Sequence, residues 1–264
     1  MNRDEFEKVI DIRDYENIIS KNESPLANAV TVSNAQILDQ ITKYSRLLEV
    51  GCGHSSFIFS NIINKQNWYG IDILQKDSRG RNSIATKIGS VDNIPYNNNF
   101  FDYIVSNQSI EHWHEYSVSY KDAINELYRV LKPQGSMLIN FPLFLHGHPM
   151  FVRGKLSKIV SLFDSRKWTI KSKTLFIDSK IKNYRGWRLC GFPDFYINRY
   201  SNCSSSYVAE LKITKINDDK LLVINNNKNK AKKLFKKKSL FLLYLMHGVD
   251  IIIWKIYQKI KKIM

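Results

Sequence analysis

The stretch Arg46–Gly53, RLLEVGCG, decides which fold this chain can adopt. Between Arg46 and Gly51 the residues are apolar apart from Glu49, which is enough for one short buried strand, and the glycines end it. Residues 57–63 then carry apolar side chains at helical spacing. Strand, glycine turn and helix are typical of a nucleotide-binding unit, because glycine lets the backbone approach a ligand closely and a new helix offers unpaired N–H groups.

The turn is not the dinucleotide fingerprint, because an acid lies on the strand itself and no third glycine follows at the expected place. A carboxylate at Glu49 attracts a cationic ligand group and repels a pyrophosphate. The segment EVGCG resembles motif I of the class I S-adenosylmethionine-dependent methyltransferases, and among these the methyltransferase type 11-like proteins. The resemblance implies S-adenosylmethionine as cofactor, bound at Glu49, Gly51, Cys52 and Gly53. An ordinary tight turn is the alternative for this segment taken alone.

A second acid, Asp72, lies at the end of the short apolar strand that begins at Trp68, about 20 residues beyond the glycine turn. In a βαβ nucleotide fold, an acid at the end of the second strand accepts hydrogen bonds from ribose hydroxyls. We therefore expect Asp72 and the adjacent Ile73 to bind the cofactor. The polar stretch 76–85 follows, and any helix in it is expected to be short.

The segment from Gly89 to Tyr96 is similar to the family's G-D-A-x-x-L-P-F segment, whose acid contacts the adenine amino group. Counted back from the proline, Ser90 occupies the position of that acid, which is a departure from the family pattern. We expect Ser90 to accept one hydrogen bond and the Val91 N–H to face the adenine ring. Asp92 takes the place of the acid if the loop shifts.

Two further elements continue the resemblance. Residues 97–106 form a turn that runs into a fourth strand, and Asn107 and Gln108 leave its carboxyl end, where open α/β sheets bind ligands. Residues 116–131 have a helical pattern, and residues 127–135 resemble the family's E-x-x-R-V-L-K-P-G-G element before a fifth strand. Asn107 and Gln108 are expected to lie beside the sulfonium group of the cofactor.

These five ordered elements, over residues 46–142, predict an α/β fold. We expect a Rossmann-like, seven-stranded, mostly parallel sheet with helices on both faces and an antiparallel last strand. The methyltransferase domain is expected at 46–227, with an acceptor-binding insertion at about 143–205. A β-hairpin of 207–216 and 221–225 is expected to supply the sixth and seventh strands.

The two ends of the chain differ from this central part. Residues 1–45 are expected to form a helical cap, broken at Ser24-Pro25, in which Ser33 caps a second helix. The cap is either a lid over the cofactor or a packing appendage. Residues 228–264 form a basic amphipathic tail with eleven lysines and one aspartate. The tail either lies in an anionic membrane surface or packs on the protein as a pair of helices.

Histidines gather at the ends of two predicted strands. His112 follows the fourth strand, and His146 and His148 follow the fifth. A hydroxyl acceptor must lose its proton during methyl transfer, and histidine is the side chain best suited to that task near neutral pH. We therefore expect one of these three histidines to be the general base. Glu111 is a further candidate, or a group that orients a histidine.

Composition limits the class of protein. The chain has 264 residues, 44% of them hydrophobic, and a formal net charge of +16 that belongs mainly to the tail. Three cysteines without metal-ligand spacing favour a reducing, cytoplasmic compartment, and no metal site is expected. We expect a methyltransferase for a small-molecule or glycan acceptor, with membrane association only peripheral. A nucleic-acid methyltransferase, which is less expected, and a non-catalytic cofactor-binding module are the alternatives.

The tail generates the first prediction. The full-length protein should sediment with anionic lipid vesicles, because each lysine near such a surface contributes about 1 kcal/mol, and a chain ending at Asn227 should not. Added salt should weaken the binding by screening the charges. Equal sedimentation of both proteins would rule out the tail as the membrane anchor.

Overall fold

A computed structural model describes the central part of the chain. The described residues are 9–15, 17–18, 25–143, 145–176, 188–190, 203–205 and 207–216. The basic tail and the predicted strand 221–225 lie outside the described residues, as does most of the predicted insertion beyond Phe176. None of the helices in the described ranges has the length and apolar content that a bilayer crossing requires.

Strands and short helices alternate along the chain. The strands are β1 (Val9–Asp11), β2 (Leu47–Val50), β3 (Trp68–Asp72), β4 (Lys87–Ile88), β5 (Phe101–Asn107), β6 (Leu131–Pro142), β7 (Trp168–Phe176), β8 (Arg188–Cys190), β9 (Cys203–Ser205) and β10 (Tyr207–Lys215). The α-helices are α1 (Pro25–Leu38), α2 (Phe57–Asn61), α3 (Tyr120–Val130), α4 (Pro149–Val152) and α5 (Leu156–Val160). The 3-10 helices are η2 (Ile12–Tyr15), η3 (Lys65–Asn67) and η4 (Ile110–Tyr116).

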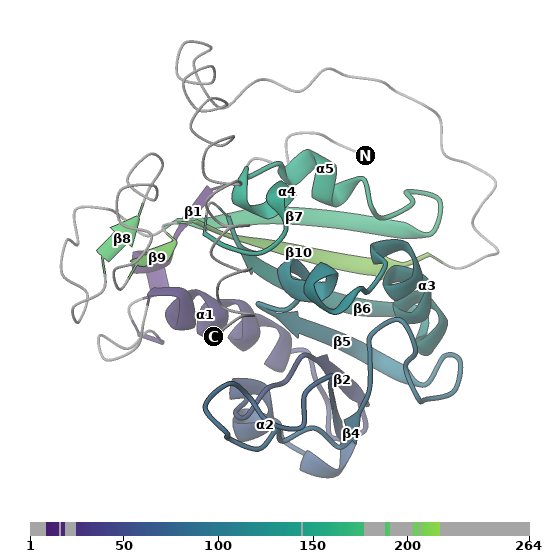
Figure 1. Cartoon of the computed structure of the whole chain (residues 1–264). Helices are drawn as coiled ribbons and strands as arrows, with labels where there is room; N and C mark the ends of the chain where they lie inside the picture. Colours follow the sequence, from purple (N-terminus) through teal and green to yellow (C-terminus); the bar gives the residue numbers. More distant parts are fainter. Residues whose placement is uncertain are drawn as a thin grey trace, which may run out of the picture. The chain divides into compact units, whose positions relative to one another are not determined.

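One large sheet organises the fold, in the order β1-β7-β10-β6-β5-β2-β3-β4 (Figure 1). Strands β2 to β6 run parallel to their neighbours within this set, whereas β10 is antiparallel to both β6 and β7. The predicted Rossmann-like, mostly parallel sheet with an antiparallel last strand is confirmed. Strand β1 adds an eighth strand at the edge, parallel to β7, so the predicted helical cap also contributes to the sheet.

The predicted hairpin is corrected by this topology. Residues Tyr207–Lys215 form β10, the antiparallel strand inserted between β6 and β7, and not the sixth strand counted from β2, the first strand of the predicted domain. In that count the sixth strand is β7, which lies within the segment expected to be an insertion. Its sequence hides the strand because only alternate residues are apolar: Trp168 and Ile170 are buried, while Thr169 and Lys171 are exposed.

The predicted cap at Ser33 is also wrong. Helix α1 begins at Pro25, a residue that fits the first helical position because its missing N–H has no intrahelical acceptor there. Ser33 lies inside this helix and is fully buried, and its hydroxyl donates a hydrogen bond to Oε2 of Glu210 at 2.5 Å. Ser33 therefore ties α1 to β10 and does not begin a helix.

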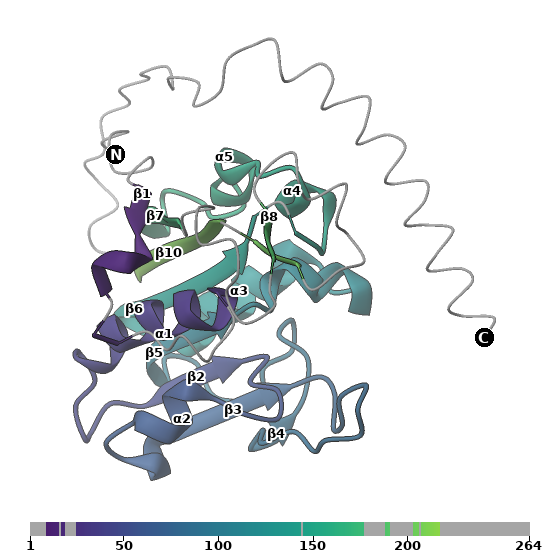
Figure 2. The same cartoon turned by 90° about the vertical axis from the view of Figure 1, so that its left-hand side faces the viewer.

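Helices cover both faces of the sheet, as predicted (Figure 2). Alternate residues of each strand point to opposite faces, so Leu47 packs with the residues of α1 and α2 while Leu48 packs with those of α3, α4 and α5. Val105 and Ile104 on β5 divide in the same way. Two hydrophobic cores thus hold the central strands rigid, and the carboxyl ends of these strands are left to carry the site.

The larger core generates a stability prediction. Trp168 is 1% exposed and its ring packs against Tyr128 and Phe163. Trp168→Ala should lower the free energy of unfolding by about 3–5 kcal/mol, because it removes a large buried ring and leaves a cavity. Tyr44→Ala, at a side chain that is 77% exposed, should change it by less than about 0.5 kcal/mol. Urea denaturation measures both, and similar losses would contradict the packing described.

Candidate active site

A pocket opens at the carboxyl ends of the parallel strands. Six of the residues expected to bind the cofactor line it: Gly51, Asp72, Ile73, Ser90, Val91 and Gln108. His112, a predicted base, lines it as well. Further lining residues that sequence reasoning missed are Val50, Ile71, Leu74, Gly89, Ser109, Trp113, Tyr116 and Val118.

Gly51 has the backbone conformation and the contact that exclude any side chain. Its φ is +71°, a value that residues with a Cβ rarely adopt, and a Cβ there would lie 2.5 Å from Oγ of Ser109. Ser109 is held in place because its hydroxyl accepts a hydrogen bond from Nε1 of Trp113 at 3.1 Å. The glycine turn and the start of η4 therefore form adjoining walls of the pocket.

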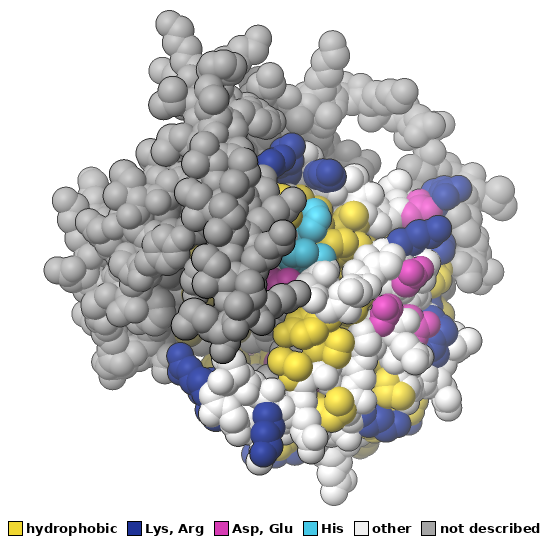
Figure 3. Space-filling model, in the orientation of Figure 1, with side chains coloured by type: hydrophobic (Ala, Val, Ile, Leu, Met, Phe, Trp, Pro, Cys, Tyr) yellow, Lys and Arg dark blue, Asp and Glu magenta, His cyan; other side chains and the backbone are white. Residues whose placement is uncertain are grey.

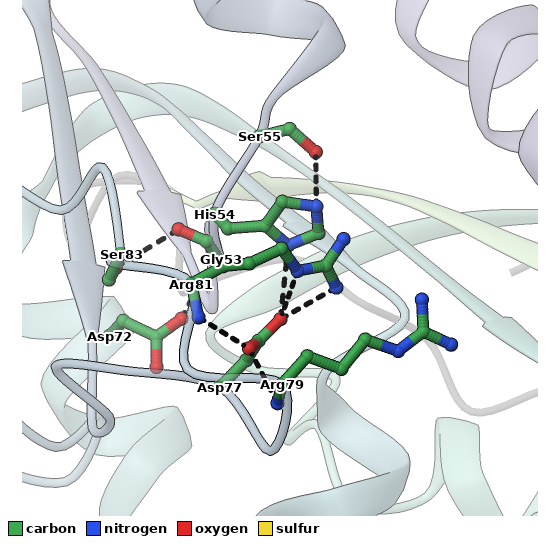
Figure 4. A network of polar contacts seen from close by, with 8 residues as sticks. All are labelled: Gly53, His54, Ser55, Asp72, Asp77, Arg79, Arg81 and Ser83. Atoms are coloured by element: carbon green, nitrogen blue, oxygen red, sulfur yellow. Dashed lines mark hydrogen bonds and ion pairs between the residues drawn. The ribbon is translucent and has the colours of Figure 1, made fainter.

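Asp72 joins the glycine turn to the end of β3 (Figure 4). Its Oδ2 accepts the Gly53 N–H at 2.8 Å, and its Oδ1 accepts the Leu74 N–H at 2.9 Å. On the other side of the turn, the Ser83 hydroxyl donates to the Gly53 carbonyl at 3.0 Å. Asp72 still lines the pocket, and a carboxylate has further lone pairs with which to accept ribose hydroxyls.

A compact turn takes the place of a second long helix after β3. In the described residues 73–86 no helix is present. Asp77 instead accepts hydrogen bonds from the backbone N–H groups of Arg79 and Arg81 and forms an ion pair with the Arg81 side chain (Figure 4). The backbone hydrogen bond from Arg81 is the main reason why the pKa of Asp77 falls to about 2. The carboxylate that organises this turn is therefore charged at neutral pH.

Glu49 lies behind the pocket and does not line it. Its side chain is buried and accepts hydrogen bonds from Oγ of Ser56 at 2.5 Å, Nε1 of Trp68 at 2.9 Å and Nδ2 of Asn107 at 3.4 Å. Burial raises its pKa, against the opposing effect of these three donors. Direct contact with the cationic end of the cofactor stays a prediction, since every hydrogen bond described here points into the protein.

Cys52 and Gly53, the other two turn residues expected to bind the cofactor, do not line the pocket. Cys52 is buried outside the pocket lining, and burial, with the charges of Glu49 and Asp72, raises the pKa of its thiol to about 12. Cys52 is therefore an uncharged packing residue at neutral pH. Gly53, also outside the lining, acts through its N–H on Asp72.

In the segment expected to bind adenine, too, only some of the predicted residues line the pocket. Ser90 and Val91 line the pocket, while Asp92 accepts a short hydrogen bond from the Ser90 hydroxyl and is not part of the lining. The hydroxyl proton of Ser90 is thus committed to Asp92, and its oxygen stays available as an acceptor. The apolar side chains of Ile73 and Leu74, 38% and 40% exposed, lie on the same pocket and suit a flat aromatic ring.

A row of amides crosses the strand ends beside the pocket. Nε2 of Gln108 donates to Oδ1 of Asn140 at 2.9 Å, and Nδ2 of Asn140 donates to Oδ1 of Asn107 at 2.5 Å. Asn107 in turn donates to Glu49. Only Gln108 of the two predicted residues lines the pocket, and Asn107 supports it from within the sheet.

Glu111, His112 and His146, which we call the acceptor cluster, lie together at the edge of the pocket. Nε2 of His146 is 3.6 Å from Oε1 of Glu111, and Nε2 of His112 is 4.0 Å from the same oxygen. Glu111 is fully buried, whereas the histidines are 43% and 34% exposed. Figure 3 shows histidine side chains gathered on one face of the protein, beside acidic and hydrophobic side chains.

His112 has its two ring nitrogens in different environments. Nδ1 is 2.8 Å from Oε1 of Glu115, and Nε2 faces Glu111. Burial lowers the pKa of His112, but the hydrogen bond to Glu115 and the charges of Glu111 and Glu115 outweigh it, and the net pKa is raised. An Nδ1–H that donates to Glu115 leaves the Nε2 lone pair available for a proton or a ligand.

His148 has a structural contact instead. Its Nδ1 accepts the Met150 N–H at 3.3 Å and caps α4, and it does not line the pocket. Gly147 before it has a φ of +87°, and a Cβ there would lie 2.6 Å from the Glu111 carbonyl oxygen. The His146-Gly147-His148 segment therefore packs directly on Glu111, with His146 directed at the carboxylate and His148 used in the helix cap.

The sheet topology, the glycine turn and Asp72 at the second strand end define a class of protein: a Rossmann-like fold with a nucleotide pocket at its strand ends. A sequence profile of the family described as "Methyltransferase domain" matches residues 48–139. These residues are a class I S-adenosylmethionine-dependent methyltransferase domain, an enzyme domain whose cofactor is S-adenosylmethionine.

Other comparisons found partial similarities. The uncharacterized protein YafE of Escherichia coli (strain K12) is 31% identical over 74 residues, which is 28% of this chain and 33% of that protein. The crystal structure of MccD protein has a TM-score of 0.47 at 16% identity and covers 70% of this chain and 96% of that one. A putative sarcosine dimethylglycine methyltransferase from Galdieria sulphuraria has a TM-score of 0.43 at 17% identity, with 78% and 98% covered.

Gly51 and Asp72 generate the prediction for cofactor binding. Gly51→Ala and Asp72→Ala should each weaken S-adenosylmethionine binding at least tenfold, about 1.4 kcal/mol or more, the first by strain and contact with Ser109 and the second by loss of the turn's acceptor. Gly80→Ala is the matched control, because Gly80 also has a positive φ but open space around it. Calorimetry on folded proteins decides, and undiminished affinity in both pocket variants would contradict the assignment.

Proposed function

We propose that the protein methylates a hydroxyl group of a small molecule or glycan, a sugar in the synthesis of a surface polysaccharide or a lipid-linked saccharide. The observation that carries the proposal is the acceptor cluster beside the cofactor pocket, with His112 belonging to both. A cluster of two imidazoles and a carboxylate suits an acceptor that must lose a proton. The cluster supports only a hydroxyl group on the acceptor. The choice of a small molecule or glycan as the molecule that carries this hydroxyl rests on the sequence.

The residues of the pocket fit S-adenosylmethionine, which supplies an electrophilic methyl group on a sulfonium. Asp72 would accept the ribose hydroxyls, and Ser90 with the Val91 N–H would face the adenine. Gly51, where a side chain has no room, would let the backbone approach the methionine part closely. The contribution of these residues is to hold the methyl group in line with the acceptor, which is a positioning effect.

The acceptor cluster would act on the other side of the methyl group. An alcohol is a weak nucleophile, so its proton has to be withdrawn as it attacks. Glu115 fixes His112 through Nδ1, and Nε2 then faces the cluster. His146 is more exposed than His112 and would contact the acceptor first. We assign no part in proton transfer to His148, which caps α4.

Other functions have less support. A nucleic-acid methyltransferase is favoured only by the net charge, which gathers in the tail, and an amino-methylating DNA enzyme would be expected to carry N/D-P-P-Y/F where this chain has Ser106–Ser109. A non-catalytic cofactor-binding module would have no need of the acceptor cluster. Peripheral attachment of a cytoplasmic protein to anionic membranes through residues 228–264 belongs to the proposal, because it suits a lipid-linked acceptor.

The test is a screen of sugar and lipid-linked acceptors with methyl-labelled S-adenosylmethionine. With an acceptor that the enzyme methylates, His112→Ala and His146→Ala should each lower kcat by about 10²–10⁴. The cofactor affinity of His146→Ala should stay close to that of the wild type. His114→Ala is the control, because His114 lies on the same 3-10 helix but packs against His148. Full turnover in both cluster variants would disprove the role of the cluster.

A further inference from the structure

The acceptor cluster can withdraw a proton in two ways: an imidazole can take it as a base, or a cation bound by the cluster can make the hydroxyl more acidic. We propose that Glu111, His112 and His146 form a binding site for a divalent transition-metal ion such as Zn²⁺. Two imidazoles and one carboxylate are a known ligand set for catalytic zinc, which keeps a further coordination position open. Three features of the cluster support the binding of a metal ion there.

The first feature is the carboxylate of Glu111. The side chain is 0% exposed, and neither of its oxygens has a hydrogen-bond partner among the residues that the structure describes. A buried carboxylate without partners is strongly unfavourable, so such groups are normally paired or coordinate a metal. The nearest cationic candidate, Nε2 of His146, is 3.6 Å away, beyond a good hydrogen bond. A metal ion between them would supply the missing partner.

The second feature is the contact between His112 and Glu115. A histidine that binds a metal through one ring nitrogen usually donates the N–H of the other to a carboxylate, which fixes the tautomer and the ring orientation. Nδ1 of His112 makes this contact with Oε1 of Glu115 at 2.8 Å, and Nε2 is directed toward Glu111. Glu115 lies on the same 3-10 helix as Glu111 and His112, so η4 carries two of the ligands and the carboxylate that orients His112.

The third feature is geometry. With metal–ligand bonds of about 2.0–2.2 Å, ligand atoms of a tetrahedral site lie about 3.3–3.6 Å apart. The separations of Nε2 of His146 and Nε2 of His112 from Oε1 of Glu111 are 3.6 Å and 4.0 Å, and ligand atoms of all three residues lie within 4.8 Å of one another. Small rotations of the partly exposed histidines would close the site. The exposed side of the histidines leaves room for an acceptor oxygen.

The role of the ion rests on the proposed function, whereas its binding does not. With the acceptor oxygen on the ion, the O–H proton passes to solvent water. The oxygen then forms a bond to the methyl carbon as the S–CH₃ bond breaks, and the electron pair of that bond stays on sulfur. His112 is in this case a ligand and a positioning group for the acceptor, and it does not carry the proton away.

The experiment measures metal binding by the full-length chain, purified without a histidine tag and without cofactor or acceptor. Calorimetry with Zn²⁺ and visible absorption with Co²⁺ should each show one site per chain. His146→Ala should weaken binding at least about 100-fold, and Glu115→Gln by about 10–100-fold, as expected for loss of an outer-shell carboxylate. Glu111→Gln should behave like His146→Ala.

The control is His114→Ala, which removes a histidine from the same helix but not from the cluster and should leave affinity unchanged. Because Glu111 is buried, Glu111→Gln can fail to fold, and the partly exposed His146 keeps the test decisive. No binding by the wild-type chain, or equal binding by wild type and His146→Ala, overturns the site. Neither result would disprove methyl transfer, because labelled-methyl assays in the presence of a chelator test that activity separately.

Discussion

The buried carboxylate of Glu49 is the interaction on which the arrangement of the strand ends depends. It accepts hydrogen bonds from Ser56 at the start of α2, Trp68 on β3 and Asn107 on β5. A carboxylate in this environment needs those donors, because a buried polar group without partners costs free energy that the fold must recover elsewhere. Glu49 thereby fixes the relative positions of three elements around β2. The glycine turn begins two residues later, so its position follows from the same contacts.

From this fixed point the site has two sides of different construction. The cofactor side is made mainly of backbone and short side chains, since Gly51 has no room for a Cβ and Asp72 holds the turn through the Gly53 N–H. The acceptor side is made of ionisable side chains carried by η4 and the segment after β6. Gly147 lets that segment pack against the Glu111 backbone. In the proposed function, positioning of the cofactor and activation of the acceptor would therefore belong to different elements, which meet at His112.

Much of this could be predicted from the sequence, for physical reasons. Strands buried on both faces are nearly continuous apolar runs, so β2, apolar apart from Glu49, and the centre of β5 are plain in the sequence. The glycine turn and Asp72 have spacings that the chemistry of nucleotide binding requires. Strand β7 was missed because its exposed face carries Thr169 and Lys171, which conceal the alternation. The pocket wall formed by Ser109 and Trp113 was missed because it depends on Gln108 at a φ of +51°, where β5 turns sharply into η4. The approach of His146 to Glu111 is a long-range contact that no local pattern contains.

We place the binding site of S-adenosylmethionine where the glycine turn, the end of β3 and η4 meet, and the proposed function depends on this placement. Hydrogen exchange of the full-length protein, with and without S-adenosylmethionine, tests it most directly. Bound cofactor should slow amide exchange in the segments 50–53, 71–74, 89–91 and 108–113 and leave exchange in β10 unchanged. Unchanged exchange in all four segments, or slower exchange confined to other parts of the chain, would contradict this placement.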